Sequence, residues 1–152
     1  MTPRLKYLLS KADPARPLWD IGCDHGYLGE GALLAGFPRV EFVDPAAHLV
    51  DKLKRRLAFR FGNTGYHALR GQDLAAPVTG NIVMAGFGGD QMREILEAWL
   101  ERGLLREGRL ILSPHKDEDK LRAWIEETFT ISEQSSFDER GRVRPIFVCE
   151  QK

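Results

Sequence analysis

Cysteine is scarce in this chain: Cys23 and Cys149 are the only two among 152 residues, and neither belongs to a C-x-x-C pair. A disulfide framework and a zinc ribbon are therefore excluded. There is no run of 18 apolar residues and no apolar segment near the first residue, so neither a membrane span nor a signal peptide is predicted. We expect a cytoplasmic protein with no metal and no membrane partner. Repeats and low-complexity tracts are also absent, and we expect residues 1–152 to form a single domain.

An excess of charge of either sign is missing too. The chain carries 22 Lys or Arg and 22 Asp or Glu, which excludes a wholly basic protein that holds nucleic acid by bulk charge. The balance is uneven, however, because residues 1–70 contain 11 basic and 7 acidic residues. Five of the basic residues fall in one predicted helix: Lys52, Lys54, Arg55, Arg56 and Arg60. Their default interpretation is a solvated helix face, and the alternative is a surface that contacts phosphates.

What is present is a regular alternation of strand and helix patterns. Short apolar runs that end at glycine or proline predict strands at 19–23, 39–44, 66–69, 81–86 and 110–112. Apolar residues at helical spacing predict a helix at 27–35, further helices between the later strands, and a short leading helix at 2–11. This alternation is typical of an α/β fold with a mostly parallel sheet and helices on both faces. The last two predicted strands, 129–131 and 143–149, have no helix between them, so we expect a hairpin across 138–141 and one antiparallel strand near the C-terminus.

The loop after the first predicted strand is the first candidate site. Gly22 and Gly26 let the backbone approach a ligand, and the next helix offers unpaired N–H groups at its N-terminus. Asp44 follows Gly22 by 22 residues, close to the offset of about 20 at which a carboxylate holds a ribose diol. This combination favours a cofactor that contains adenosine. The alternative is a tight strand-to-helix turn in which Asp24 only caps the helix.

Two carboxylates distinguish this loop from a dinucleotide-binding loop. Asp20 and Asp24 would repel a pyrophosphate, because like charges close together in a partly buried site are costly. S-adenosylmethionine instead carries a sulfonium and an ammonium, which carboxylates can hold, and we favour it over NAD. Gln72-Asp73-Leu74 follows the third predicted strand, where Asp73 either meets the edge of an adenine ring or is a routine turn residue.

A second glycine-rich loop follows the fourth predicted strand, at 85–90. Ligands of open α/β sheets bind at this end of the strands. Its three glycines leave room for a planar substrate, and Phe87 is suited to stack on a base. The alternative is a loop that only starts the next helix, with Asp90 as its N-cap. Of the four histidines, we expect only His25 to take part in catalysis. His115 either lines the same mouth or lies on the surface, and no two histidines have the spacing of metal ligands.

Several segments resemble, in order along nearly the whole chain, the bacterial TrmK-type tRNA (adenine-N1)-methyltransferases. The most specific are Asp-Ile-Gly-Cys-Asp-His-Gly-Tyr-Leu at 20–28 and Ile-Val-Met-Ala-Gly-Phe-Gly-Gly at 82–89. The others are a leading Arg-Leu helix, Gly-Gln-Asp-Leu at 71–74, Leu-Ile-Leu-Ser-Pro at 110–114 and Leu-Arg-Ala-Trp-Ile at 121–125.

The resemblance implies a Rossmann-like class I methyltransferase with a seven-stranded sheet, S-adenosylmethionine as cofactor and N1 of adenosine 22 in tRNA as acceptor. The cofactor-binding residues that we expect are Asp20, Gly22, Asp24, His25, Gly26, Asp44, Pro45, Gln72, Asp73, Leu74, Ala85 and Gly86. Those expected at the acceptor are Phe87, Gly88, Gly89, Pro114 and His115. We expect Asp24, His25 and Tyr27 to be catalytic, with Asp24 stabilising the positive charge that develops on the adenine ring. A role of Asp24 in holding the cofactor alone stays open.

The chain departs from the family pattern at three places. It has Gly29 where the family usually has a proline, Phe87 where the family has a methionine, and Ser113-Pro114-His115 where the family tends to have Gln-Pro-Asn. We also expect a short form, because Lys152 comes soon after the last predicted strand, without the helical C-terminal extension that helps such proteins to grip tRNA. Two alternatives stay open. One is a methyltransferase of another acceptor, such as other RNA, a protein or a small molecule, and the other is a catalytically silent protein that binds cofactor or RNA within a complex. The oligomeric state is not predicted.

Overall fold

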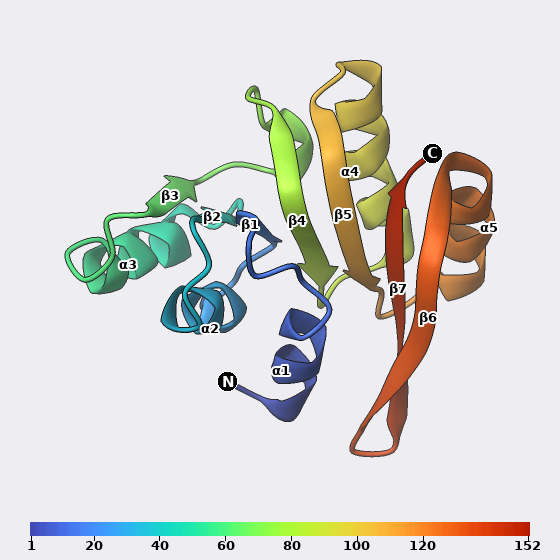
Figure 1. Cartoon of the computed structure of the whole chain (residues 1–152), viewed down its shortest axis with the longest axis horizontal. Coiled ribbons are helices and arrows are strands. Elements are labelled where there is room, and N and C mark those ends of the chain that lie inside the picture. The colour runs from blue at the N-terminus through green and yellow to red at the C-terminus, as the bar shows by residue number, and fades with distance from the viewer.

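The computed structural model describes residues 1–152 and contains one seven-stranded sheet in the order β3-β2-β1-β4-β5-β7-β6 (Figure 1). The strands are β1 (Leu18–Ile21), β2 (Val40–Val43), β3 (Thr64–His67), β4 (Val78–Ala85), β5 (Leu105–Ser113), β6 (Phe129–Glu139) and β7 (Arg142–Gln151). The helices are α1 (Pro3–Leu9), α2 (Tyr27–Leu34), α3 (Ala47–Leu57), α4 (Gly89–Glu101), α5 (Glu118–Thr128) and the one-turn helix η1 (Gly71–Asp73). The predicted α/β architecture with a mostly parallel sheet is confirmed.

The sheet is buried on both faces. One apolar cluster joins Ile82 and Met84 of β4 to α4 and α5, and a second joins Val83 to α1, α2 and α3. Because successive side chains of a strand point to opposite faces, consecutive residues of β4 supply both clusters. This double burial explains why the central strands appear in the sequence as continuous apolar runs.

The order of the strands reverses between β1 and β4. From β1 the chain continues to β2 and β3 on one side, and then returns to β4 on the other side of β1. Helix α2, which follows β1, and helix α4, which follows β4, pack on opposite faces of the sheet. The loops after these two strands therefore diverge, and open α/β sheets bind ligands in the crevice at such a point.

Strands β6 and β7 form the predicted antiparallel hairpin. Its turn has Arg140 and Gly141 with φ of 53° and 84°, and Asp138 Oδ1 accepts the N–H of Gly141 at 2.8 Å. Two successive positive φ values are typical of the type I′ turn that twisted hairpins favour. Both strands are longer than predicted, and β7 lies between β5 and β6, antiparallel to each.

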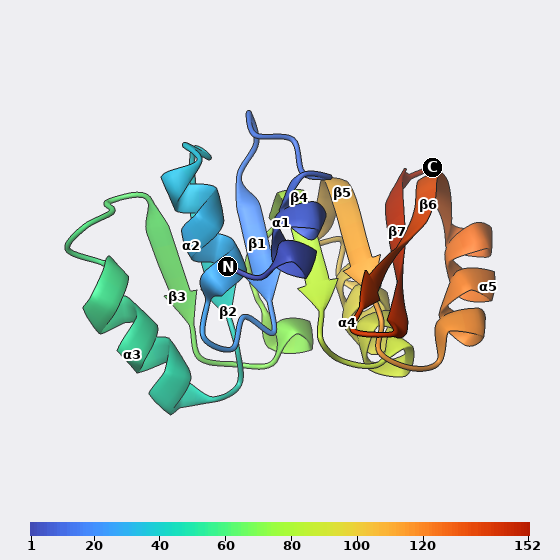
Figure 2. The same ribbon diagram turned by 90° about the horizontal axis from the view of Figure 1, so that it is seen from below.

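Helix α1 lies in front of β4, between α2 and the β6–β7 hairpin (Figure 2). It is slightly shorter than predicted, and Thr2 Oγ1 caps it by accepting the N–H of Leu5 at 3.2 Å. The buried side chain of Asn81 in β4 holds the segment after α1, because it accepts the N–H of Asp13 and donates to the carbonyl of the same residue, each at 2.8 Å. None of the helices combines the length and apolar character that crossing a bilayer requires.

Candidate functional site

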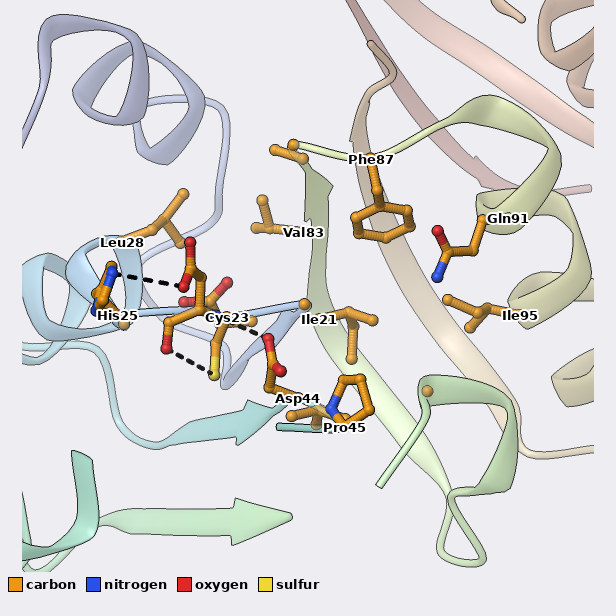
Figure 3. Close-up of a pocket in the computed structure, with 18 of the residues that line it drawn as sticks. Ile21, Cys23, His25, Leu28, Asp44, Pro45, Val83, Phe87, Gln91 and Ile95 are labelled. Carbon is orange, nitrogen blue, oxygen red and sulfur yellow. Dashed lines mark hydrogen bonds and ion pairs between the residues drawn. The ribbon is translucent and has the colours of Figure 1, made fainter. Parts of the chain in front are cut away.

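A cavity of about 520 Å³ opens at the carboxyl ends of β1 and β4, where the strand order reverses (Figure 3). This volume is in the range of small-molecule and cofactor sites. Segments far apart in the sequence line it: residues 4–5, 20–28, 43–45, 70–72, 83, 85–87, 91 and 95. The fold therefore brings together the two glycine-rich loops that the sequence singled out.

The two loops face each other at Gly22 and Phe87. Gly22 has a φ of 71°, and a β-carbon on it would lie 2.9 Å from Cε1 of the Phe87 ring. Gly26 also has a positive φ, of 77°, and a β-carbon there would meet Leu53 at 2.4 Å. Each position requires a positive φ and leaves no room for a β-carbon. Only glycine satisfies both requirements, since other residues rarely adopt this backbone conformation. The glycines thus let the loop after β1 fold tightly between α3 and the loop after β4.

Asp20 ends in the interior, beneath the loop after β1. Its Oδ2 accepts the N–H of Gly29 at 3.2 Å, so it caps the first turn of α2 from a neighbouring strand. The pKa of Asp20 is raised to about 7, chiefly by burial; the bond from Gly29 opposes this rise, and the carboxylates of Asp44 and Asp24 add to it. This part of the cavity therefore has a negative potential that a cationic ligand would relieve.

Asp44, at the end of β2, is buried, and its two oxygens hold two segments of backbone. Oδ2 accepts the N–H of Asp24, and Oδ1 accepts the N–H of Ala46, both at 2.9 Å. Each oxygen keeps a further lone pair. Asp44 thus fixes the loop after β1 while it lines the cavity, and Pro45 lines it beside Asp44.

Asp24, His25 and Tyr27 line the outer part of the cavity and are exposed. Asp24 Oδ1 lies 3.7 Å from His25 Nε2, and the rings of His25 and Tyr27 are 5.8 Å apart. Asp24 has a φ of 51°, which Asp tolerates better than most residues. The three predicted catalytic side chains are therefore adjacent and accessible to a second molecule at the mouth.

The loop after β4 contributes only its first half to the cavity. Ala85, Gly86 and Phe87 line it, whereas Gly88 and Gly89, which were predicted to contact the acceptor, do not. Gly89 instead packs against the next loop, where a β-carbon would lie 2.8 Å from the carbonyl oxygen of Asp117. Gly88 is the N-cap of α4.

Pro114 and His115 also lie outside the lining. Pro114 is buried, and His115 is exposed. The backbone N–H of His115 donates to the carbonyl of Phe87 at 2.9 Å, so this segment supports the loop after β4 from behind. Its side chain approaches Arg4, which does line the cavity.

The segment after β3 is positioned by Trp99, whose Nε1 donates to the carbonyl of Gly71 at 2.8 Å. Gln72 lines the cavity as expected, but Asp73 and Leu74 are not brought to it. Asp73 pairs with Arg70 at 2.9 Å, and that hydrogen bond lowers the pKa of Asp73. Leu74 belongs to the apolar core. The one-turn helix η1 turns both side chains away from the site.

Several lining residues were not predicted. Arg70 and Gly71 directly precede the expected Gln72, so proximity in sequence could have found them. Gln91 faces the cavity from the first turn of α4, opposite Asp44 and Pro45 (Figure 3). Arg4 belongs to the leading helix, and nothing local in the sequence indicates that it reaches a site made by residues 20–87.

The cavity has neither an activated thiol nor a metal-binding group. Cys23 lines it, but only 6% of this residue is exposed and burial raises its pKa above the ordinary value, so the thiol stays protonated. No three His, Cys, Asp or Glu side chains are placed to hold a metal ion. The chemistry available is that of carboxylates, an imidazole, a phenol, an amide, the guanidinium groups of Arg4 and Arg70, and backbone N–H groups.

Comparison with known proteins agrees with this geometry. Residues 1–147 match the family described as a methyltransferase domain. The chain belongs to this methyltransferase family. No curated protein sequence matches it.

Solved structures confirm the Rossmann-like fold and the resemblance to TrmK-type proteins. Sp1610 from Streptococcus pneumoniae, a candidate tRNA (m1A22) methyltransferase, superimposes on this methyltransferase with a TM-score of 0.88 at 26% identity, over 99% of this chain and 70% of Sp1610. Its complex with S-adenosyl-L-methionine gives a TM-score of 0.78 at 25% identity, over 99% and 73% of the two chains. TrmK from B. subtilis, an m1A22 tRNA methyltransferase, gives 0.88 at 23% identity, over 100% and 67%.

Proposed function

We propose that this methyltransferase uses S-adenosylmethionine to methylate N1 of adenosine 22 in tRNA. The observation that carries the proposal is the cavity at the β1–β4 reversal, with three carboxylates on one side and Phe87 on the other. The likeness to TrmK-type proteins supports the choice of acceptor. We propose further that residues 1–152 act as one domain, in the cytoplasm where tRNA is found.

The residues of the cavity fit this cofactor. Asp20, Asp24 and Asp44 line it together, and their proximity contributes to the raised pKa of Asp20. Such a group favours a cation and disfavours a pyrophosphate. Asp44 would hold the ribose hydroxyls with its free lone pairs, and Asp24 would face the cationic part. When bound, S-adenosylmethionine supplies a methyl group on a positively charged sulfur.

The mouth of the cavity is suited to a planar acceptor. Phe87 offers a ring face on one side, and the rings of His25 and Tyr27 lie 5.8 Å apart on the other. Transfer to N1 uses the nitrogen lone pair and leaves the adenine ring positively charged. The exposed carboxylate of Asp24 would stabilise that charge as it develops, while the aromatic groups fix the angle of approach.

A basic surface adjoins this mouth. A shallow pocket lined by His25, Tyr27, Lys52 and Arg56 connects the loop after β1 with α3. Arg56 is paired with Glu30. Lys52, Lys54 and Arg55 are exposed and take part in no ion pair, so their charges are available to phosphates.

Two measurements on one preparation test the proposal. Calorimetric titration with S-adenosylmethionine measures cofactor binding, and methyl transfer to unmodified tRNA is followed by nucleoside mass spectrometry. We expect binding, and 1-methyladenosine at position 22. Transfer to a tRNA in which adenosine 22 is replaced by guanosine is the matched control, and it should yield none.

The other outcomes separate the alternatives. Binding with methylation of another nucleoside, a protein or a small molecule would keep the methyltransferase and replace the acceptor. Binding without transfer to any RNA pool would favour a silent cofactor-binding partner. Absence of binding would overturn the proposed cofactor.

A further inference from the structure

Arg4 is a buried cation that makes no ion pair; Glu139 attracts it electrostatically from a distance, and Arg144 repels it. Only 8% of this residue is exposed, yet its guanidinium takes part in no ion pair and its Nε has no hydrogen-bond partner. Burying a charge is costly unless it is paired, and a guanidinium stays charged at all ordinary pH values. Since Arg4 lines the cavity, a bound anion is the partner that would account for its position.

His115 holds this guanidinium from the side away from the cavity. Arg4 Nη2 lies 3.4 Å from His115 Nε2, and because a guanidinium can only donate, Nε2 must accept. His115 is then neutral, with its proton on Nδ1. His115 is exposed as a residue, but partial burial still lowers its pKa, and Arg144 and Arg4 lower it further, which agrees with this assignment. His115 therefore orients Arg4 without competing for an anion.

Further cations act on the pair from the β6–β7 hairpin. This hairpin lies beside α1 (Figure 2). Arg144 and Arg142 of β7 both act electrostatically on His115, and Glu139 is the one carboxylate that does. Glu139 already lies 3.8 Å from Arg144. This side of the cavity therefore has surplus positive charge, in contrast to the three carboxylates after β1 and β2.

We infer that Arg4, positioned by His115, forms an oxyanion-binding subsite at the basic end of the cavity. The planar fork of a guanidinium matches the paired oxygens of a carboxylate or a phosphate. Two sources can supply such a group: the amino-acid carboxylate of the cofactor, or a phosphate of the acceptor nucleotide. The naming of these two sources rests on the proposed function, whereas the existence of the subsite does not.

Matched ligand pairs test the subsite and identify the source. S-adenosylhomocysteine is compared with 5′-methylthioadenosine, which lacks the amino-acid carboxylate, and adenosine 5′-monophosphate is compared with adenosine. Each ligand is titrated by calorimetry into the wild type and into Arg4→Gln, Arg4→Lys and His115→Gln. Arg106→Gln is the control, since Arg106 is exposed at the start of β5, at the end of the strand away from the cavity.

The expected result is a selective loss in Arg4→Gln of about 10-fold or more for one anionic ligand, with its uncharged counterpart unchanged. Loss for S-adenosylhomocysteine identifies the carboxylate, and loss for adenosine 5′-monophosphate identifies the phosphate. His115→Gln should weaken the same ligand by a smaller factor, and Arg106→Gln should weaken none. If Arg4→Gln does not fold, Arg4→Lys carries the test, because lysine keeps the charge but loses the paired donors.

Two results would overturn the subsite: affinities within 2-fold of wild type for every ligand, or an equal loss for all four, which would show that Arg4 has a structural role only. A wild type that binds no S-adenosylhomocysteine would count against the proposed function. In that case the subsite is still judged, by whether Arg4→Gln abolishes a preference for adenosine 5′-monophosphate over adenosine.

Discussion

The carboxylate of Asp44 accepts the backbone N–H of Asp24 at 2.9 Å, and this bond joins the end of β2 to the loop after β1. A residue that we propose to hold the cofactor therefore also fixes the loop after β1. Since one carboxylate has both tasks, replacing Asp44 should weaken cofactor binding directly and should also loosen the loop after β1.

Replacement Asp44→Asn should weaken S-adenosylmethionine binding by about 10-fold or more. The amide removes a negative charge and can offer only one oxygen, whereas the carboxylate now accepts from both Asp24 and Ala46. Calorimetric titration measures the loss. Asp51→Asn, an exposed carboxylate on α3, is the control and should bind as the wild type does. Unchanged affinity in Asp44→Asn would contradict the assignment.

The stability of the protein without ligand should depend on Asp20. The pKa of this residue is about 7 in the folded protein, against an ordinary value of 3.8. The folded state therefore binds the proton more tightly than the unfolded chain does, so this residue makes stability fall as pH rises from about 4 to about 7. Asp20→Asn keeps an acceptor for Gly29 and removes the titration.

Urea unfolding at several pH values measures this effect. The difference in free energy of unfolding between Asp20→Asn and the wild type should shift in favour of the variant as pH rises from 4 to 7, and should be constant above about 7.5. A difference that stays constant from pH 4 to pH 8 would show that Asp20 does not titrate abnormally.

Gly29 is a packing requirement of α2. A β-carbon at this position would lie 2.3 Å from Cε1 of the buried Phe42 ring. Gly29→Ala should therefore destabilise the protein by about 1–3 kcal/mol, although alanine normally favours a helix. Gly31→Ala is the control in the same helix, because its β-carbon would crowd only the flexible end of Met1 and would meet Leu9 at an ordinary contact distance of 3.6 Å, so it should be neutral or stabilising. Thermal unfolding compares the two, and equal melting temperatures would refute the packing argument.

The sequence predicted those parts of the site that depend on local pattern. The loop at 20–28 could be recognised because its glycines and carboxylates are close in sequence and follow a strand. Asp73 and Leu74 were misplaced relative to the cavity because a one-turn helix rotates them away and Arg70 is near enough to pair with Asp73. Arg4 could not be found, since its contact with His115 spans 111 residues and depends on how α1 packs.

Asp24→Asn should lower turnover about 100-fold while changing cofactor affinity by much less. Both residues tolerate the positive φ of 51° found here, so the loop should keep its shape. The carboxylate makes no hydrogen bond that would hold the loop, and its charge is therefore free to stabilise the methylated ring. Single-turnover methyl transfer and calorimetry measure the two quantities separately. Equal losses in both would mean that Asp24 only holds the cofactor.

Binding of tRNA should depend steeply on salt, and Lys52, Lys54 and Arg55 should cause part of that dependence. These three side chains are exposed on α3, next to the pocket that joins this helix to the mouth of the cavity. Each phosphate contact contributes about 0.7 to 0.9 to the slope of log affinity against log salt, so the triple glutamine variant should reduce the slope by up to about 2 to 3.

A double glutamine variant at Arg106 and Lys152 is the control and should leave this slope unchanged. Filter binding between 50 and 200 mM salt gives both slopes. If the triple variant keeps the wild-type slope, tRNA does not contact α3 and must approach the mouth from another side.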